Sequence, residues 1–499
     1  MKISKLLYYT SNRIVYATVF VILTILMLTN LRFSTYVMNI KENISVQDTN
    51  LFLVAGYLLI LFVFMFLILK YSEKIKEKNL FLLFSLVYLV IGIYMIMNIN
   101  SVLRYDALSI HNAAIAMHQG DFSAMDVGHY IYRYPHQIGF MIYEYMMGFI
   151  SHDAKILFWV NFFAVFVINF FIYQIAKEIF ENQHKINLVT ITLSFLFLPQ
   201  FFFVTFAYGL IPGFCFLMIG IYGLFRFVRT GKRKWMIMSS IFLMLAVLMK
   251  KNFIIAMVAC LCYLFLQWLR KKDKKFLTFM LLIFTIFVLG KMMMTIGIES
   301  YSGKKVNKGV PSILWVAMGT DPKNHKRSGG WYDKKYVNVY KNTNFDRKRS
   351  EKIGEKMVLG YFKYYKKYPE KAYQFFSKKI TTTWADPLYE SIFSGPKQEA
   401  DQYVKTKSLY RLFNEEKYDT GLYLVMKAYA ILLLVSAWIF VWKYFKKYEK
   451  VTLGLIFLIG GFLFHLFWET KGQYVYPYIF MQIPASSYVI VKIFEKKTA

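Results

Sequence analysis

The sequence is poor in cysteine and in acidic residues. Only three cysteines occur among 499 residues, and Cys215, Cys260 and Cys262 all lie in apolar stretches. We interpret them as small buried apolar residues without a disulfide framework. Acidic side chains number 29 against 61 lysines and arginines, which gives a formal net charge of +32. In a soluble protein, such a charge would first indicate a nucleic-acid partner.

The chain also lacks the motifs of nucleotide and metal chemistry. It has no Asp-x-Asp pair, no GxxxxGK[ST] loop and no Cys/His spacing typical of a metal site. No small-residue cleavage site follows the first apolar stretch, so we expect that stretch to be retained. These absences argue against ATP-driven transport and against chemistry on a cytosolic nucleotide sugar.

Long apolar stretches are what the chain has in excess. It is 57% hydrophobic and 19% aromatic, with a mean hydropathy of +0.39. A membrane-spanning helix needs about 20 mostly apolar residues, and the sequence offers twelve such spans. We therefore predict an all-α polytopic membrane protein that does not bind nucleic acid. The spans cover residues 14–33, 51–70, 80–98, 156–175, 187–205, 209–228, 234–249, 252–269, 275–294, 422–442, 451–468 and 474–492.

Basic residues occupy alternate links between these spans. Short basic links stay cytosolic, so we expect both termini in the cytosol and two long segments, 99–155 and 295–421, outside. The apolar stretch 138–150 is too short to span and carries Glu144, so we interpret it as a re-entrant or interfacial helix on the outer face. The predicted parts are a two-helix addition (1–79), a transmembrane core (80–294), a mostly helical outer loop domain (295–421) and C-terminal helices (422–499).

The first outer loop holds an acidic candidate. Asp106 lies just beyond the predicted bilayer edge and close to Arg104. An acid there can act as general base for an acceptor hydroxyl, or hold a divalent cation. A helix cap or a surface salt bridge is the simpler alternative.

The start of the short outer helix is rich in polar groups, with Arg133, Tyr134, His136 and Gln137 around Pro135. Backbone N–H groups at a helix start favour anions, so a phosphate could dock here. An interfacial anchor is the alternative.

Two adjacent lysines, Lys250 and Lys251, lie between two spans at the predicted outer face, where the charge bias does not place them. They form either a clamp for a lipid-linked phosphate or a pair of snorkelling side chains.

Two further clusters lie on the outer side. The last outer link is crowded with polar groups that suit a functional turn or an ordinary interfacial one: Glu469, Lys471, Gln473 and Tyr474. The large loop has aromatic and acidic residues that suit either a sugar face or the core of the loop domain: Trp331, Tyr332, Trp384 and Asp386.

Taken together, these motifs resemble the GT-C superfamily of membrane glycosyltransferases, over roughly residues 80–492. Arg104-Tyr105-Asp106 is similar to the family's acidic motif, and residues 134–137 to its proline-containing motif. Lys250 or Lys251 resembles its phosphate-binding lysine, and residues 469–474 its late turn. The segments around Gly330 and at 384–387 look like those of Gram-positive members that decorate cell-wall polymers.

The resemblance implies a donor, a site and a reaction. The enzyme would move a hexose-type sugar from undecaprenyl phosphate to an extracytoplasmic acceptor such as teichoic acid or a polysaccharide, with inversion. The donor phosphate would rest near Lys250, Lys251 and Lys471, with Arg133 and Arg104 close by, and Asp106 would be the base. A divalent cation, Mg²⁺ or Mn²⁺, is compatible with the acidic motif. The alternatives are a flippase or exporter of lipid-linked saccharides, a polysaccharide polymerase, and a scaffold without enzymatic activity.

Overall fold

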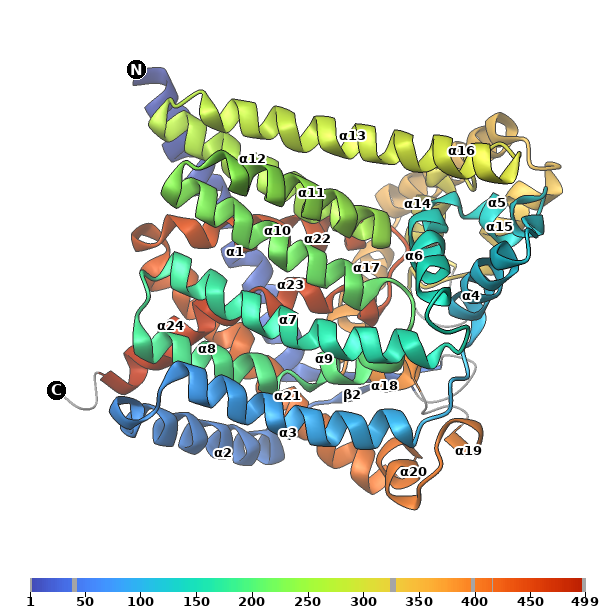
Figure 1. The fold of residues 1–499 in the computed structure, drawn as a ribbon. Helices are drawn as coiled ribbons and strands as arrows, with labels where there is room; N and C mark the ends of the chain where they lie inside the picture. The colour runs from blue at the N-terminus through green and yellow to red at the C-terminus, as the bar shows by residue number, and fades with distance from the viewer. Residues whose placement is uncertain (1, 38–42, 324–328, 396–399, 415, 496–499) are drawn as a thin grey trace.

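The computed structural model describes residues 2–37, 43–323, 329–395, 400–414 and 416–495. These residues are almost entirely helical (Figure 1), and the predicted all-α membrane fold is confirmed. The one sheet in these ranges is an antiparallel hairpin of β1 (Phe33–Val37) and β2 (Ile44–Asp48), in which Phe33 lies opposite Asp48.

Nine helices in the described ranges are long and apolar enough to cross a membrane, or ten if a bent pair counts as one span. The bent pair is α8 (His184–Leu196) with α9 (Leu198–Phe202), broken by 46°. The nine long helices are α1 (Lys2–Arg32), α2 (Leu51–Lys70), α3 (Glu77–Met97), α7 (Lys155–Ile179), α10 (Leu210–Thr230), α12 (Ile254–Lys271), α13 (Lys275–Ser302), α21 (Glu416–Tyr444) and α22 (Thr452–Phe467).

The other two of the twelve predicted spans are shorter or broken. Residues 234–249 fall in α11 (Arg233–Met249), which has only 17 residues. Residues 474–492 form α23 (Tyr476–Phe480) and α24 (Ile483–Glu495), with Pro477 and Pro484 near their starts. Proline has no N–H to donate to the preceding turn, so it starts a helix more readily than it continues one. Hydropathy alone does not register these breaks.

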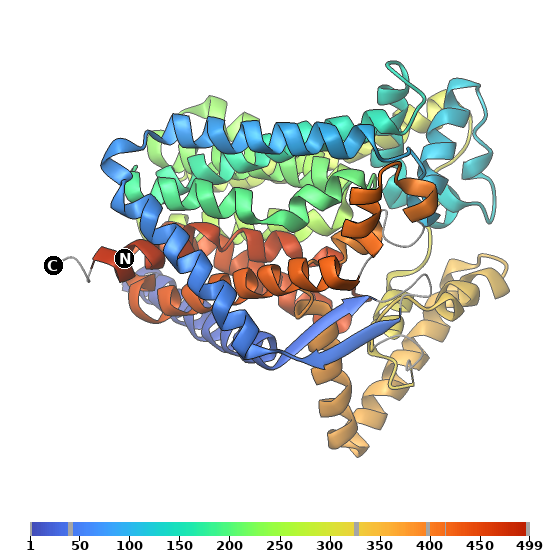
Figure 2. The same cartoon turned by 90° about the horizontal axis from the view of Figure 1, so that it is seen from below.

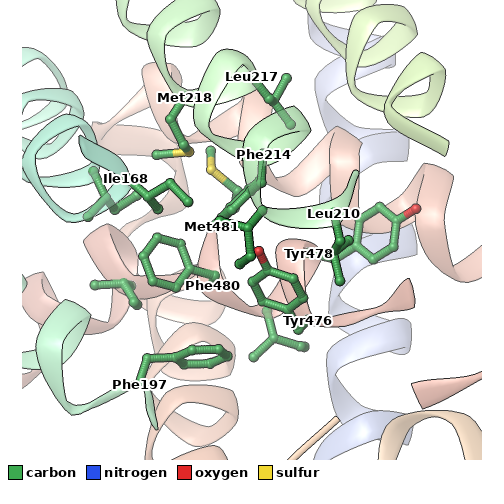
Figure 3. Packing of buried hydrophobic residues seen from close by; sticks show 14 of the residues in the cluster. Ile168, Phe197, Leu210, Phe214, Leu217, Met218, Tyr476, Tyr478, Phe480 and Met481 are labelled. Atoms are coloured by element: carbon green, nitrogen blue, oxygen red, sulfur yellow. The ribbon is translucent and has the colours of Figure 1, made fainter. Parts of the chain in front are cut away.

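Aromatic side chains fill the place where the two broken helices meet. The ring of Phe197, in the break between α8 and α9, lies 5.3 Å from that of Phe480, and Phe214 lies 5.3 Å from Tyr476 (Figure 3). All four are buried. This cluster is the middle of the bundle core.

Shorter helices gather at one end of the bundle, whereas α1 begins and α24 ends at the opposite end (Figure 1). The outer set comprises α4 (Tyr105–His118), α5 (Tyr130–Arg133), α6 (Ile138–Gly148), α14 (Ser312–Thr320), α15 (Lys334–Asn342), α16 (Arg347–Lys367), α17 (Pro369–Trp384) and α18 (Ser391–Ser394). The 11-residue α6 is the short helix expected from residues 138–150.

The first helix is integrated into the bundle. It packs against α21, α22 and α12. The buried ammonium group of Lys427 on α21 donates to Asn30 Oδ1 at 2.9 Å, to the Phe33 carbonyl at 2.6 Å and to the Ala385 carbonyl at 3.1 Å. Lys427 therefore ties the end of α1 and the start of β1 to the end of α17.

Paired charges hold the end of the bundle opposite the outer helices. The buried carboxylate of Glu178 lies 2.9 Å from Arg226 Nη1 and 3.3 Å from Arg229 Nη1. Glu77 lies 3.4 Å from Lys177 Nζ and 3.0 Å from His184 Nδ1. The basic links at this end are thus in part neutralised by acids of neighbouring helices.

Candidate active site

A cavity of about 1000 Å³ lies between the outer helices and the adjacent end of the bundle. Thirteen of the sixteen candidate residues line it, although they come from separate stretches of the chain. These thirteen are Arg104, Asp106, Arg133, Tyr134, His136, Gln137, Lys250, Lys251, Tyr332, Glu469, Lys471, Gln473 and Tyr474. The other three, Trp331, Trp384 and Asp386, are buried outside the lining.

Two glycines bring the backbone close to the segment that carries Lys250. A Cβ added to Gly139, at the start of α6, would lie 2.3 Å from the Leu248 carbonyl oxygen. At Gly209, just before α10, it would lie 2.4 Å from the Met249 carbonyl oxygen, and the φ of +72° is one that glycine adopts without strain. The end of α11 is therefore enclosed by two other helix starts, and Lys250 emerges from that enclosure.

Lys250 is 8% exposed and lies against Tyr208. Its Nζ is 3.5 Å from the centroid of the Tyr208 ring and 3.5 Å from the Tyr208 carbonyl oxygen. Burial lowers the pKa of Lys250 to about 7, against the opposing pull of the Asp106 and Glu469 carboxylates. The face of the Tyr208 ring and the Asp106 and Glu469 carboxylates stabilise the ammonium charge of Lys250. An anion that enters the cavity would stabilise it further.

Asp106 sits in the first turn of α4 and faces the cavity. The cap position is Arg104, and no side chain caps the start of this helix, so Asp106 does not have the capping role considered from the sequence. The Tyr208 hydroxyl donates to Asp106 Oδ2 at 3.1 Å, and Gln137 Nε2 donates to the same hydroxyl at 2.7 Å. Tyr130 also hydrogen-bonds within this group. The carboxylate is thereby oriented while remaining accessible from the cavity.

Tyr208 connects the acid and the lysine. Its hydroxyl contacts Asp106, and its ring face contacts Lys250. The sequence offered little signal for it, because an uncharged Tyr-Gly pair before a span is unremarkable. Its importance follows only from the contacts on its two sides.

The segment around Pro135 is joined to the loop before α14. The Val310 N–H donates to the Arg133 carbonyl at 3.0 Å. Gly309 has a φ of +69°, and a Cβ there would lie 2.4 Å from Pro135 Cδ. His136 faces the cavity, where desolvation, and then the charges of Lys251 and Lys250, lower its pKa. Its imidazole is therefore neutral at neutral pH and can donate or accept a hydrogen bond.

Arg104 and Arg133 line the cavity but already contact neighbouring groups. The Arg104 guanidinium donates to the Gly395 carbonyl at 2.9 Å and to that of Phe393. Arg133 Nε donates to the His129 carbonyl at 3.3 Å. Both arginines thus support the wall of the cavity, and their phosphate-binding role stays a prediction.

Residues that follow α17 support the last outer turn through hydrogen bonds. The Gly472 N–H donates to the buried carboxylate of Glu390. Asp386 in turn accepts from the N–H groups of Leu388 at 2.9 Å and Glu390 at 2.8 Å. Asp386 therefore positions Glu390, which positions the turn that carries Lys471.

The two predicted sugar-stacking tryptophans are packing residues in this structure. Trp384 lies 5.9 Å from the Phe462 ring and 6.0 Å from the Tyr478 ring. Trp331 lies beneath Lys471, whose Nζ is 5.5 Å from the indole centroid. Tyr332, by contrast, is half-buried and lines the cavity beside Tyr134. Sugar contact by the tryptophans stays a prediction.

Positive charge dominates the cavity lining. Eight lysines and arginines face three acids, Asp106, Glu390 and Glu469. Three of the basic residues were not singled out from the sequence: Lys291, Lys308 and Arg347. Lys291 could have been, because it interrupts the apolar stretch of α13 well inside the helix. Lys308 and Arg347 could not, because the surrounding loop is basic throughout.

Groups of three or more His, Cys, Asp or Glu side chains that could hold a metal ion do not occur in the described ranges. Asp106 and Glu469 are therefore not accompanied by a third such ligand. A divalent cation at this site stays a prediction.

Residues 138–290 match the sequence model of the dolichyl-phosphate-mannose-protein mannosyltransferase family. This match indicates a membrane glycosyltransferase of the GT-C type. The matching segment runs from α6 into α13, so it includes Tyr208, Lys250 and Lys251 but not Asp106. The resemblance drawn from the motifs is confirmed over that segment. No curated protein and no solved structure matches the chain.

Proposed function

We propose that the enzyme transfers a sugar from a polyprenyl-phosphate-linked donor, such as undecaprenyl phosphate, to an acceptor outside the cytosol. The observation that carries this proposal is the Asp106–Tyr208–Lys250 group in a cavity with eight basic and three acidic residues. Asp106 as a general base and Lys250 as an anion-binding group lie on two sides of Tyr208. This arrangement suits the transfer of a sugar away from a phosphate.

Lys250 and Lys251 would bind the donor phosphate, and Lys471 would approach from the last outer turn. Positive charge stabilises the phosphate as its bond to the anomeric carbon breaks, which makes polyprenyl phosphate a better leaving group. The electron pair of that bond leaves with the phosphate oxygen. The acceptor hydroxyl oxygen forms the new bond to the anomeric carbon, and its proton passes to Asp106. A single base and a direct displacement predict inversion of configuration.

The acceptor that suits this surface is anionic. Residues 347–378, which form α16 and most of α17, hold ten lysines and arginines and three glutamates. A surface of one sign raises the local concentration of an oppositely charged partner. Teichoic acid or another anionic cell-wall polymer fits this charge, as a neutral glycan would not.

The basic links support the orientation in which both chain ends lie in the cytosol. All of the links between spans that we expect inside are at the end of the bundle where α1 begins (Figure 1). The cavity, at the other end, would then face away from the cytosol.

The proposal is tested in cells that lack this protein. We expect a purified wall polymer to lose one sugar substituent while the polymer itself is retained, and wild-type protein to restore it. Asp106→Asn should leave membrane insertion intact and lower transfer by about 10²–10⁴-fold, the usual contribution of a general base. Asp126→Asn is the matched control, because Asp126 is an exposed acid of the same outer segment, paired with Lys304.

An active Asp106→Asn variant would contradict the catalytic assignment. Loss of the whole polymer would favour export or polymerisation over sugar transfer.

A further inference from the structure

Helices α16 and α17 form a hairpin that projects sideways from the bundle. The chain turns between them at Tyr368, and Pro369 begins α17. Figure 2 shows the hairpin, coloured tan to light orange, extending to one side of the bundle at the end that carries the outer helices. Its tip therefore lies at the level of the ends of the membrane-spanning helices.

The hairpin packs against α14 on one side and has an open surface elsewhere that carries exposed apolar side chains. On α16, Gly354 lies against Ile313 of α14, and Ser350 and Tyr365 are buried with it. Large apolar and aromatic side chains face outward elsewhere: Leu359 is 62% exposed, Phe362 41% and Tyr373 75%. Exposed apolar groups that share a surface mark an interaction site.

This open face continues the surface of a membrane-spanning helix. The ring of Phe467, at the end of α22, lies 6.4 Å from Phe362 and 6.2 Å from Phe376. Leu463 and Phe467 of α22 are themselves 47% and 41% exposed, as lipid-facing residues can be. Phe362 thus lies beside the exposed side chains of α22 at the point where this helix ends.

Lysines are frequent along the same hairpin. Between residues 352 and 378 the hairpin has seven lysines and two glutamates. A lysine stem can lie along an apolar surface while its ammonium group reaches the phosphates, and basic segments beside a membrane bind anionic lipids. The lysines are Lys352, Lys356, Lys363, Lys366, Lys367, Lys371 and Lys378.

We propose that the α16–α17 hairpin is an interfacial anchor that binds anionic phospholipid headgroups in the leaflet at the cavity end of the bundle. Leu359, Phe362 and Tyr373 enter the interface, and the lysines contact the phosphates. The anchor does not depend on which donor or acceptor the enzyme uses.

The anchor is mechanically connected to the cavity through Lys379. This buried lysine, near the end of α17, donates to the Gly319 carbonyl at 2.5 Å and to the Trp468 carbonyl at 2.7 Å. Trp468 directly precedes Glu469 and the last outer turn. Binding of lipid by the hairpin therefore restrains the same backbone that carries Lys471.

The test places an environment-sensitive fluorophore on Phe362→Cys, in full-length protein whose three native cysteines are replaced by alanine. The protein is studied in nanodiscs of phosphatidylcholine alone or mixed with phosphatidylglycerol. We expect nitroxide-labelled lipid to quench the fluorophore, and to do so more strongly when phosphatidylglycerol is present. A label at Lys334→Cys on α15, which is exposed on the outer side, should be quenched mainly from water.

Charge variants separate anionic headgroups from simple apolar insertion. Lys363→Gln, Lys366→Gln and Lys367→Gln together should abolish the phosphatidylglycerol dependence. The same change at Lys334, Lys341 and Lys348, which are exposed away from the tip, should preserve it. Two results would overturn the proposal: equal quenching from water at both labels, or a phosphatidylglycerol dependence that survives in the tip variant.

Discussion

The charged residues that hold one end of the helix bundle and those that line the cavity at the other end differ in their balance of sign. At the end where the chain begins, Glu178 pairs with Arg226 and Arg229. At the cavity end, eight basic residues share a lining with three acids, and Lys250 rests on a tyrosine ring. Buried charge is costly unless it is paired, so paired charges hold a structure together. An unbalanced set is tolerated where a ligand supplies the missing charge, which is why we place the donor phosphate in the cavity.

Among changes to the charged residues at the two ends, we expect Lys250→Met to have the largest effect on donor binding. The change keeps most of the side-chain volume against Tyr208 but removes the charge. We expect the KM for the lipid-linked donor to rise about tenfold to a hundredfold, since a hydrogen bond to a charged group contributes about 1.5–3 kcal/mol. Steady-state kinetics of the purified enzyme would show this. An unchanged KM would mean that the phosphate binds elsewhere in the cavity.

The dependence of donor binding on pH tests the role of Lys250 in a second way. Burial lowers the pKa of Lys250 to about 7. Below this pH the lysine is charged before the donor arrives, whereas above it binding must also take up a proton. We expect the donor KM to rise with pH above about 7, by up to about tenfold for each pH unit. The rise should disappear in Lys250→Met, and a rise that persists there would assign it to another group.

The motifs at the ends of spans could be predicted from the sequence because membrane burial leaves few polar residues to choose from. Asp106 and Lys250 stand out where hydropathy ends, and the structure brings both to the cavity. Trp384 and Trp331 could not be assigned in this way, because an aromatic residue suits a protein core as well as a sugar face. Tyr208 was missed, since nothing in its neighbours along the chain shows that it contacts both groups.

The breaks in the bundle were equally hidden from hydropathy. The segment 474–492 has the composition of one span, but its prolines divide it into α23 and α24. The segment 1–79 was expected to be an addition to the core. That division stays a prediction, but α1 packs against the C-terminal helices, and Lys427 bonds to Asn30 and Phe33. The break follows from local prolines, which hydropathy does not weigh. The placement of α1 depends on contacts between residues hundreds of positions apart, which a single sequence does not reveal.

A smaller effect is expected from Tyr208→Phe. The change removes the hydroxyl that donates to Asp106 at 3.1 Å but keeps the ring beneath Lys250. We expect kcat to fall about tenfold, on the scale of one hydrogen bond to a charged group, with the donor KM nearly unchanged. Kinetics with the donor varied would separate the two constants. An equal change in KM would show that the hydroxyl acts on phosphate binding and not on the base.

The smallest effect on transfer is expected at the opposite end. Glu178→Gln removes the carboxylate that lies 2.9 Å from Arg226 Nη1. We expect the thermal unfolding midpoint to fall, because two arginines lose their acid, while the turnover of folded enzyme stays within about twofold, since differential binding at the site is untouched. Thermal shift and kinetics on one preparation measure both. A large loss of turnover would contradict the distinction between charges that stabilise the fold at this end and charges that bind the donor at the cavity end.

We propose that the excess positive charge of the cavity binds a lipid phosphate. The most direct measurement is the binding of undecaprenyl phosphate to purified protein by native mass spectrometry, with uncharged undecaprenol as the matched ligand. We predict that the phosphate lipid binds more tightly than the alcohol, that Lys250→Met with Lys251→Met abolishes the difference, and that Arg229→Gln at the other end preserves it. Equal binding of the two lipids by the wild-type protein would contradict the claim.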